Sequence, residues 1–181
     1  MQITPLRLGE GSRGESRAGV RPPLRPHATH RTGFTMSLTL EQANRIIVAA
    51  LAKARALKLP PVGVAVMDPG GHLIAMQRED GLSFLRIKVA QAKAYSALAM
   101  GTHTRHLATR FEQGGRTEGF FTALNALSGG NVITVPGGVL VHAKDGTLLG
   151  AVGISGARSE DDEACAVAGI EATGFKVNLE S

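Results

Sequence analysis

The sequence predicts a domain of the α+β class, in which helices alternate with antiparallel hairpins. Three observations support this class: a capped helical pattern opens the domain, two pairs of short apolar runs are each joined by a glycine-containing turn, and helical patterns follow each pair. With 181 residues and 43% hydrophobic content, the chain can bury one sizeable core, so one folded domain is expected.

Residues 1–35 differ in composition from the rest of the chain. They contain six Arg, no Lys, two Glu and four of the eight Pro, which gives a net charge of +4 without an apolar period. We expect a disordered tail at 1–35 and a folded domain at 36–181, with the tail as an upstream extension before Met36. Since the formal net charge is +5, only about +1 belongs to the domain, and nucleic acid is not an expected partner.

Two absences in the sequence bear on location. No run of roughly 18 apolar residues occurs, so no membrane partner is expected. Cys165 is the only cysteine, which excludes an internal disulfide and fits a reducing compartment. The expected location is therefore cytoplasmic.

The first helix is predicted between Thr39 and about Leu57. Thr39 and Gln42 form a capping-box pattern, in which each side chain can satisfy a free backbone N–H of the other residue. Pro60 and Pro61 end the helix. One buried stripe is expected from apolar residues at helical spacing, namely Ile46, Ile47, Ala50, Leu51 and Ala54.

Two β-hairpins are predicted from short apolar runs. The first pairs residues 62–67 with 72–77 across "DPGG", and the second pairs 138–143 with 147–154 across "KDG". The glycines of the second hairpin lie between strands, whereas a phosphate-binding loop needs them between a strand and a helix. We therefore interpret them as turn residues and as sites of close backbone approach.

Two more helices are predicted, one over 84–100 with Ser83 as its cap and one that begins at Ser159. The helix over 84–100 is apolar on more than one side, so we expect the sheet to cover one side and a second subunit to cover another, as in an isologous dimer. The stretch 101–127 is interpreted as a connection followed by a Gly-rich segment that contains Phe.

Five motifs, in this order, carry a resemblance to a known family: "MDPGGHLIAMQREDG", "VAQAKAYSALAM", "VPGGVLV", "GTLLGAVGISG" and "EDDEACAVAG". Over roughly residues 38–175 the chain resembles the GlcG/HbpS-like heme-binding family, which includes the C-terminal domain of PduO-type proteins. The resemblance implies a three-layer α-β-α sandwich around a five-stranded antiparallel sheet, similar to profilin-like folds. It also implies assembly into dimers or larger rings, and heme as a possible cofactor.

The resemblance singles out cations for the binding site. Arg78 and Lys93 can each hold a carboxylate or a heme propionate, and Arg105 is a further cation of this kind. The alternative for the first two is a structural role, as an Arg78–Asp80 or a Lys93–Asp162 ion pair.

Histidines are the other candidates, because heme iron takes a His, Cys, Met or Tyr as its axial ligand. His103 and His106 lie three residues apart in "THTRH", next to Thr102 and Thr104, and can face one site as metal ligands. The alternative is a solvated surface cluster.

Three functions remain open. The first is a heme-binding or heme-sequestering protein, and the second is an enzyme acting on a small carboxylate, with Arg78 or Lys93 as the anion clamp. The third is a purely structural oligomer. Catalytic residues stay unassigned, because the sequence contains no recognisable pairing of a nucleophile with a base and no His-Glu-x-x-His or Cys-x-x-Cys motif.

Overall fold

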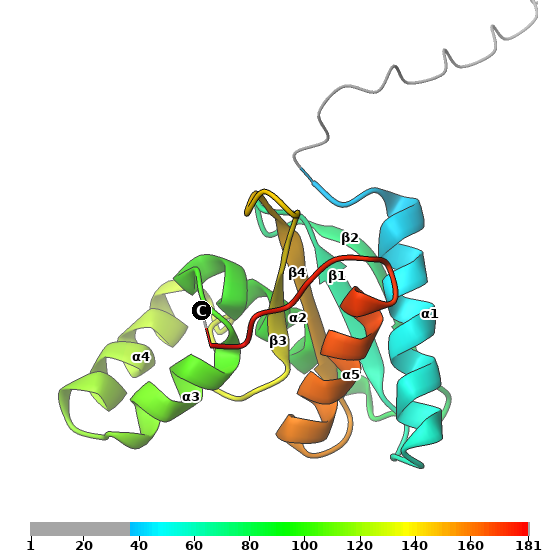
Figure 1. Cartoon of the computed structure of the whole chain (residues 1–181). Helices are drawn as coiled ribbons and strands as arrows, with labels where there is room; N and C mark the ends of the chain where they lie inside the picture. The colour runs from blue at the N-terminus through cyan, green and yellow to red at the C-terminus, as the bar shows by residue number, and fades with distance from the viewer. Residues whose placement is uncertain (1–36, 181) are drawn as a thin grey trace, which may run out of the picture. The chain divides into compact units, whose positions relative to one another are not determined.

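The computed structural model describes residues 37–180 (Figure 1), and the predicted disordered tail at 1–35 lies outside these residues. Within them, no helix combines the length and the apolar character needed to cross a bilayer. The elements of this part follow in the order α1 (Leu40–Ala56), β1 (Gly63–Met67), β2 (Leu73–Arg78), α2 (Phe84–Met100), α3 (Thr104–Glu112), α4 (Arg116–Leu127), β3 (Gly138–His142), β4 (Leu148–Ser155) and α5 (Ser159–Glu171).

The strands form one antiparallel sheet in the order β2-β1-β4-β3. Helices α1 and α5 pack on one face of the sheet and α2 packs on the other, which gives three α-β-α layers (Figure 1). On the α2 face, small residues bring the helix against the strands: a Cβ added at Gly153 would lie 2.0 Å from the carbonyl oxygen of Ala90. The expectation of close backbone approach at the glycines is confirmed there.

Several local predictions are confirmed. The backbone N–H of Thr39 donates to Oε1 of Gln42 at 2.9 Å, and the N–H of Gln42 donates to Oγ1 of Thr39 at 3.1 Å, which completes the capping box. In the first hairpin, Oδ1 of Asp68 accepts the backbone N–H groups of Gly70 and His72. These features depend on residues close in sequence, which is why the sequence predicts them.

The interpretation of 101–127 as a connection followed by a Gly-rich segment was wrong, because this stretch forms α3 and α4. Gly114 and Gly115 have positive φ values of 66° and 61° and separate the two helices. Leu107 of α3 and Phe121 of α4 are buried, and Phe111 lies beside Phe121 with ring centroids 6.3 Å apart. The glycines weaken the helical pattern of the sequence, and the two helices are stabilised by packing on each other.

The expected five-stranded sheet has four strands among residues 37–180. A fifth strand would lie at the outer edge of β3, and there the C-terminal segment, residues 175–180, makes one isolated antiparallel bridge between His142 and Lys176. Side chains from the beginning of α3 occupy the rest of this edge. They are the physical reason why the ladder stops after one bridge.

Candidate functional site

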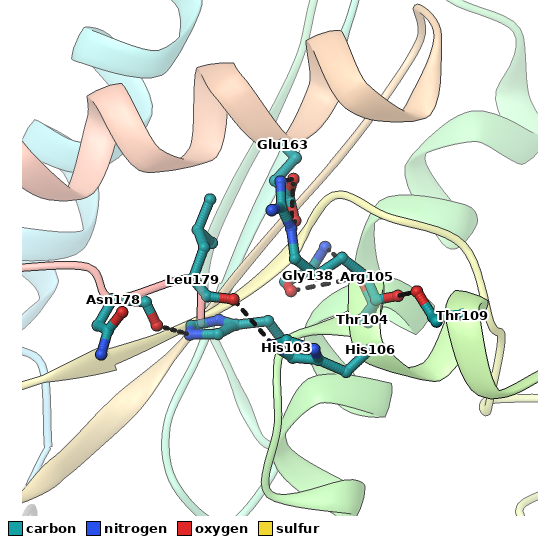
Figure 2. Close-up of polar contacts among 9 residues, drawn as sticks. All are labelled: His103, Thr104, Arg105, His106, Thr109, Gly138, Glu163, Asn178 and Leu179. Carbon is teal, nitrogen blue, oxygen red and sulfur yellow. Dashed lines mark hydrogen bonds and ion pairs between the residues drawn. The ribbon is translucent and has the colours of Figure 1, made fainter. Parts of the chain in front are cut away.

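His103 is the N-cap residue of α3, and its side chain is buried between β3 and the C-terminal segment (Figure 2). The backbone N–H of Leu140 donates to its Nδ1 at 3.1 Å, so the ring proton lies on Nε2, which donates to the carbonyl oxygen of Asn178 at 2.9 Å. Burial lowers the pKa of His103, and the bond to Asn178 opposes this effect. Both ring nitrogens of a neutral imidazole are therefore engaged.

Thr104 continues the cover of the β3 edge (Figure 2). Its Oγ1 accepts the backbone N–H of Gly138 at 2.8 Å and lies 3.3 Å from the carbonyl oxygen of the same residue. Together with His103 and the bridge at His142, it provides partners at alternate positions along β3. An edge strand otherwise offers unpaired backbone groups to other chains, so these contacts cover the edge of the sheet.

His106 lies one turn into α3, and its Nε2 donates to the carbonyl oxygen of Leu179 at 2.8 Å. The rings of His103 and His106 are 6.3 Å apart and tilted by 43°, and their Nε2 atoms bond to consecutive carbonyl groups. Among residues 37–180, every buried side-chain nitrogen or oxygen has a partner, and Nδ1 of His106 makes no hydrogen bond there. That nitrogen is therefore not fully buried and has no hydrogen-bond partner among residues 37–180.

The other two candidate residues in 102–106 are Arg105 and Thr102, and they have different partners. Arg105 holds the buried carboxylate of Glu163 on α5, with Nε 3.0 Å from Oε1 and 3.1 Å from Oε2, and Nη2 also bonds to Oε2 (Figure 2). Thr102 donates its backbone N–H to the carbonyl oxygen of Ala97 at the end of α2. The predicted site segment is thus a structural junction between α3, α5, β3 and the C-terminal segment.

Lys93 forms the buried ion pair that the sequence left as an alternative. Its Nζ lies 2.8 Å from Oδ2 of Asp162, both side chains are buried, and Oδ1 of Asp162 accepts the backbone N–H of Ala157 at 3.0 Å. Burial lowers the pKa of Lys93, and the neighbouring Asp162 opposes this shift. Gly137 lies against the pair, since a Cβ there would be 2.7 Å from Nζ.

Arg78 lies away from the other predicted site residues. It ends β2, the edge strand opposite β3, and its side chain is exposed. No ion pair with Asp80 is found in the described part of the chain. The structure therefore brings together His103, Thr104 and His106, but not Arg78.

An apolar cavity that the sequence did not predict lies beside α3 and α4. It is open on one side and has a volume of about 350 Å³, and the guanidinium of Arg110 lies 5.4 Å from the centre of the Phe121 ring. Its walls are Phe111, Phe121, Thr122, Asn125, Val132, Ile133, Thr134 and Val135. The only signal for this cavity in the sequence was the Phe residues of the stretch. Because α3 and α4 were not predicted, there was no reason to place these residues together.

No group of three or more His, Cys, Asp or Glu side chains that could hold a metal ion occurs within residues 37–180.

A family model described as "Haem degrading protein HbpS-like" matches residues 38–171. Among curated proteins, the chain is 29% identical over 143 residues to "Corrinoid adenosyltransferase PduO" of Citrobacter freundii, covering 79% of this chain and 41% of that protein. It is 34% identical over 120 residues to "Protein GlcG" of Escherichia coli K12, covering 65% and 81% respectively. The chain spans about two fifths of the length of the PduO relatives that it matches.

Solved structures give the same relationship. The crystal structure of a PduOC:heme complex has a TM-score of 0.69 and 29% identity, covering 78% of this chain and 99% of that chain. A double mutant of HbpS from Streptomyces reticuli has a TM-score of 0.62 and 29% identity, covering 86% and 97% respectively.

Proposed function

The chain belongs to the HbpS-like family, and we propose on this basis that it is a heme-binding or heme-sequestering protein. The observation that carries the proposal is the similarity to PduOC, which was crystallised as a heme complex and is matched over 99% of its length. This chain spans only 41% and 38% of the two full-length PduO proteins, so the activity in their name does not carry over to it.

We propose that His106 would hold the iron of the heme. Neutral imidazole is a common iron ligand through either nitrogen, and Nδ1 of His106 has no hydrogen-bond partner among residues 37–180 while its Nε2 bonds to the carbonyl oxygen of Leu179. A hydrogen bond at the second nitrogen orients a metal-bound histidine, which is the role that the carbonyl of Leu179 can fill. His103 would first have to give up one of its two hydrogen bonds.

The surroundings of His106 fit the rest of the group. Arg110 follows one turn later on the same side of α3, and its exposed guanidinium can bind a propionate. Arg110 lies over the ring of Phe121, which lines the cavity beside α3 and α4, and this cavity offers apolar walls for the edge of the heme. When bound, heme supplies the iron centre; the tasks of the chain are to hold the iron, pair with the propionates and exclude water.

The alternative of an enzyme acting on a small carboxylate has weaker support. Of its two proposed anion clamps, Lys93 is buried against Asp162, and only Arg78 is exposed. None of the described contacts favours this reaction over heme binding.

We also propose that the chain forms a homo-oligomer. Large apolar side chains are exposed at the beginning of α2, where Phe84 is 76% accessible, and at the end of α4, where Leu127 is 84% accessible. Exposed apolar clusters of this kind commonly mark interfaces.

Titration of the purified protein with hemin tests the heme proposal. We expect saturation near one hemin per subunit, or one per pair of subunits, with a Soret band distinct from that of free hemin. Binding no stronger than to an unrelated basic protein would contradict the proposal.

A further inference from the structure

The C-terminal segment lies beside β3 in a definite antiparallel register. The bridge between His142 and Lys176 fixes this register. In this register Leu140, two residues before His142, would face Asn178, two residues after Lys176. In an antiparallel ladder, residues two positions from a bridge repeat its pattern of hydrogen bonds. The N–H of Leu140, which points away from β4, would therefore donate directly to the carbonyl oxygen of Asn178.

The imidazole of His103 is inserted between these two groups, and Figure 2 shows its bond to Asn178. Nδ1 takes the N–H of Leu140 at 3.1 Å, and Nε2–H donates to the carbonyl oxygen of Asn178 at 2.9 Å. The ring thus presents an acceptor to one strand and a donor to the other. It satisfies the same two backbone groups that a continued ladder would join.

The C-terminal segment already has the alternation of a strand. Phe175, Val177 and Leu179 pack against the core, whereas Lys176, Asn178 and Glu180 are exposed. Successive side chains of a strand point to opposite faces, so closing against β3 keeps the same residues on the core side. Gly174, with φ +84°, precedes the segment and has no neighbour within 4 Å of an added Cβ.

We propose that residues 175–180 are a fifth strand held open by His103, and that the ring is a removable insert. When it leaves, Leu140 and Asn178 pair directly, so neither backbone group is left buried without a partner. This matters because an unsatisfied buried N–H costs far more than an exchanged hydrogen bond. His103 is then released as a free imidazole; its use as an iron ligand in that state rests on the proposed heme function.

Two other contacts hold the open arrangement. Nε2 of His106 donates to the carbonyl oxygen of Leu179, and Oγ1 of Thr104 accepts the backbone N–H of Gly138. In the closed register Gly138 faces Glu180, so the ladder can extend there only if Thr104 also moves. The first pairing gained on closure is therefore that of Leu140 with Asn178.

Amide NMR on the full chain without heme tests the inference independently of the heme function. In His103→Ala, we expect cross-strand nuclear Overhauser effects between Leu140 and Asn178, and protection of the Leu140 amide within about tenfold of the wild type. His103→Phe is the matched variant, since it keeps a ring in place but offers no nitrogen. Its Leu140 amide should exchange much faster, without the new cross-strand effects.

His106→Ala is the control, because it removes a bond to the same segment and leaves the insert in place; it should not show direct pairing. If His103→Ala does not fold, His103→Ser provides the same test with a small side chain. Fast exchange of the Leu140 amide and a detached C-terminal segment in the small-residue variant would overturn the inference. The inference would also be overturned if the small-residue and Phe variants showed the same exchange rate of the Leu140 amide and the same cross-strand effects.

Discussion

The backbone N–H of Leu140 donates to Nδ1 of His103 at 3.1 Å, and this bond determines the protonation state of the ring. A nitrogen that accepts this bond cannot carry a proton. A second proton on His103 would therefore break the contact to β3 and place a charge in a buried position.

Stability should fall as acid protonates His103. Its folded-state pKa is lowered from the ordinary value of 6.5 by burial, so below that pH the unfolded chain binds more protons than the folded chain. The stabilising contribution is present above pH 6.5 and is lost as pH falls through the folded pKa. Urea unfolding at several pH values from about 7.5 to 5 should show a smaller pH dependence for His103→Gln than for the wild type. Equal slopes in the wild type and His103→Gln would contradict this prediction.

Removing Lys93 alone should be strongly destabilising. Lys93→Met leaves the buried carboxylate of Asp162 without its cation, and breaking such a pair costs about 3–5 kcal/mol. The double variant Lys93→Met, Asp162→Asn should recover part of this loss, because the remaining amide is neutral and can still accept the N–H of Ala157. Chemical denaturation of the four proteins measures the coupling, and purely additive effects would show that the pair does not act as a unit.

Gly137 should tolerate a side chain less well than Gly146. Both have positive φ values, of 112° and 86°, but an added Cβ meets Lys93, Asp162 and Ile154 at Gly137 and meets nothing within 4 Å at Gly146. Gly146→Ala should therefore cost about 1–2 kcal/mol from its backbone conformation, and Gly137→Ala clearly more. Thermal unfolding of the two variants compares them directly, and a similar loss in both would argue against a close approach at Gly137.

The heme site should respond differently to two variants of α3. His106→Ala should shift the Soret band of the hemin complex, because it removes the residue proposed to hold the iron. Arg110→Gln should weaken hemin affinity about tenfold at an unchanged band position, because it touches only a propionate. Lys144→Gln, in the turn of the second hairpin, removes an exposed cation elsewhere and serves as the control. An unchanged spectrum in His106→Ala would rule out this ligand but leave heme binding itself intact.

Light scattering should give a mass of at least twice the 18.9 kDa subunit at micromolar concentration. Replacing Phe84 or Leu127 by Ser should shift the protein towards the monomer if that residue lies in the interface, without a large loss of folding stability, because both are exposed in the subunit. A monomeric wild-type protein would remove the oligomer proposal.

The sequence predicted those features that depend on neighbouring residues. The capping box at Thr39 and the Asp68 turn need contacts only three or four residues apart, so their residue types suffice. The partners of His103 lie 37 and 75 residues away along the chain, and nothing local indicates them. Helix α4 was missed because Gly115 and Gly119 weaken the local helical signal, and its stability comes from packing against α3.

The cover on the outer edge of β3 also governs how copies of this chain can associate. The C-terminal segment that borders this edge is held by a few polar contacts and three inward-facing apolar side chains. A segment of this kind can leave its own subunit and occupy the same place on a neighbour, which is the geometry of domain swapping. His103 and Thr104 hold the backbone N–H groups of Leu140 and Gly138, so if the C-terminal segment moved to a neighbour, these two side chains would still cover part of an edge that could otherwise pair with another chain.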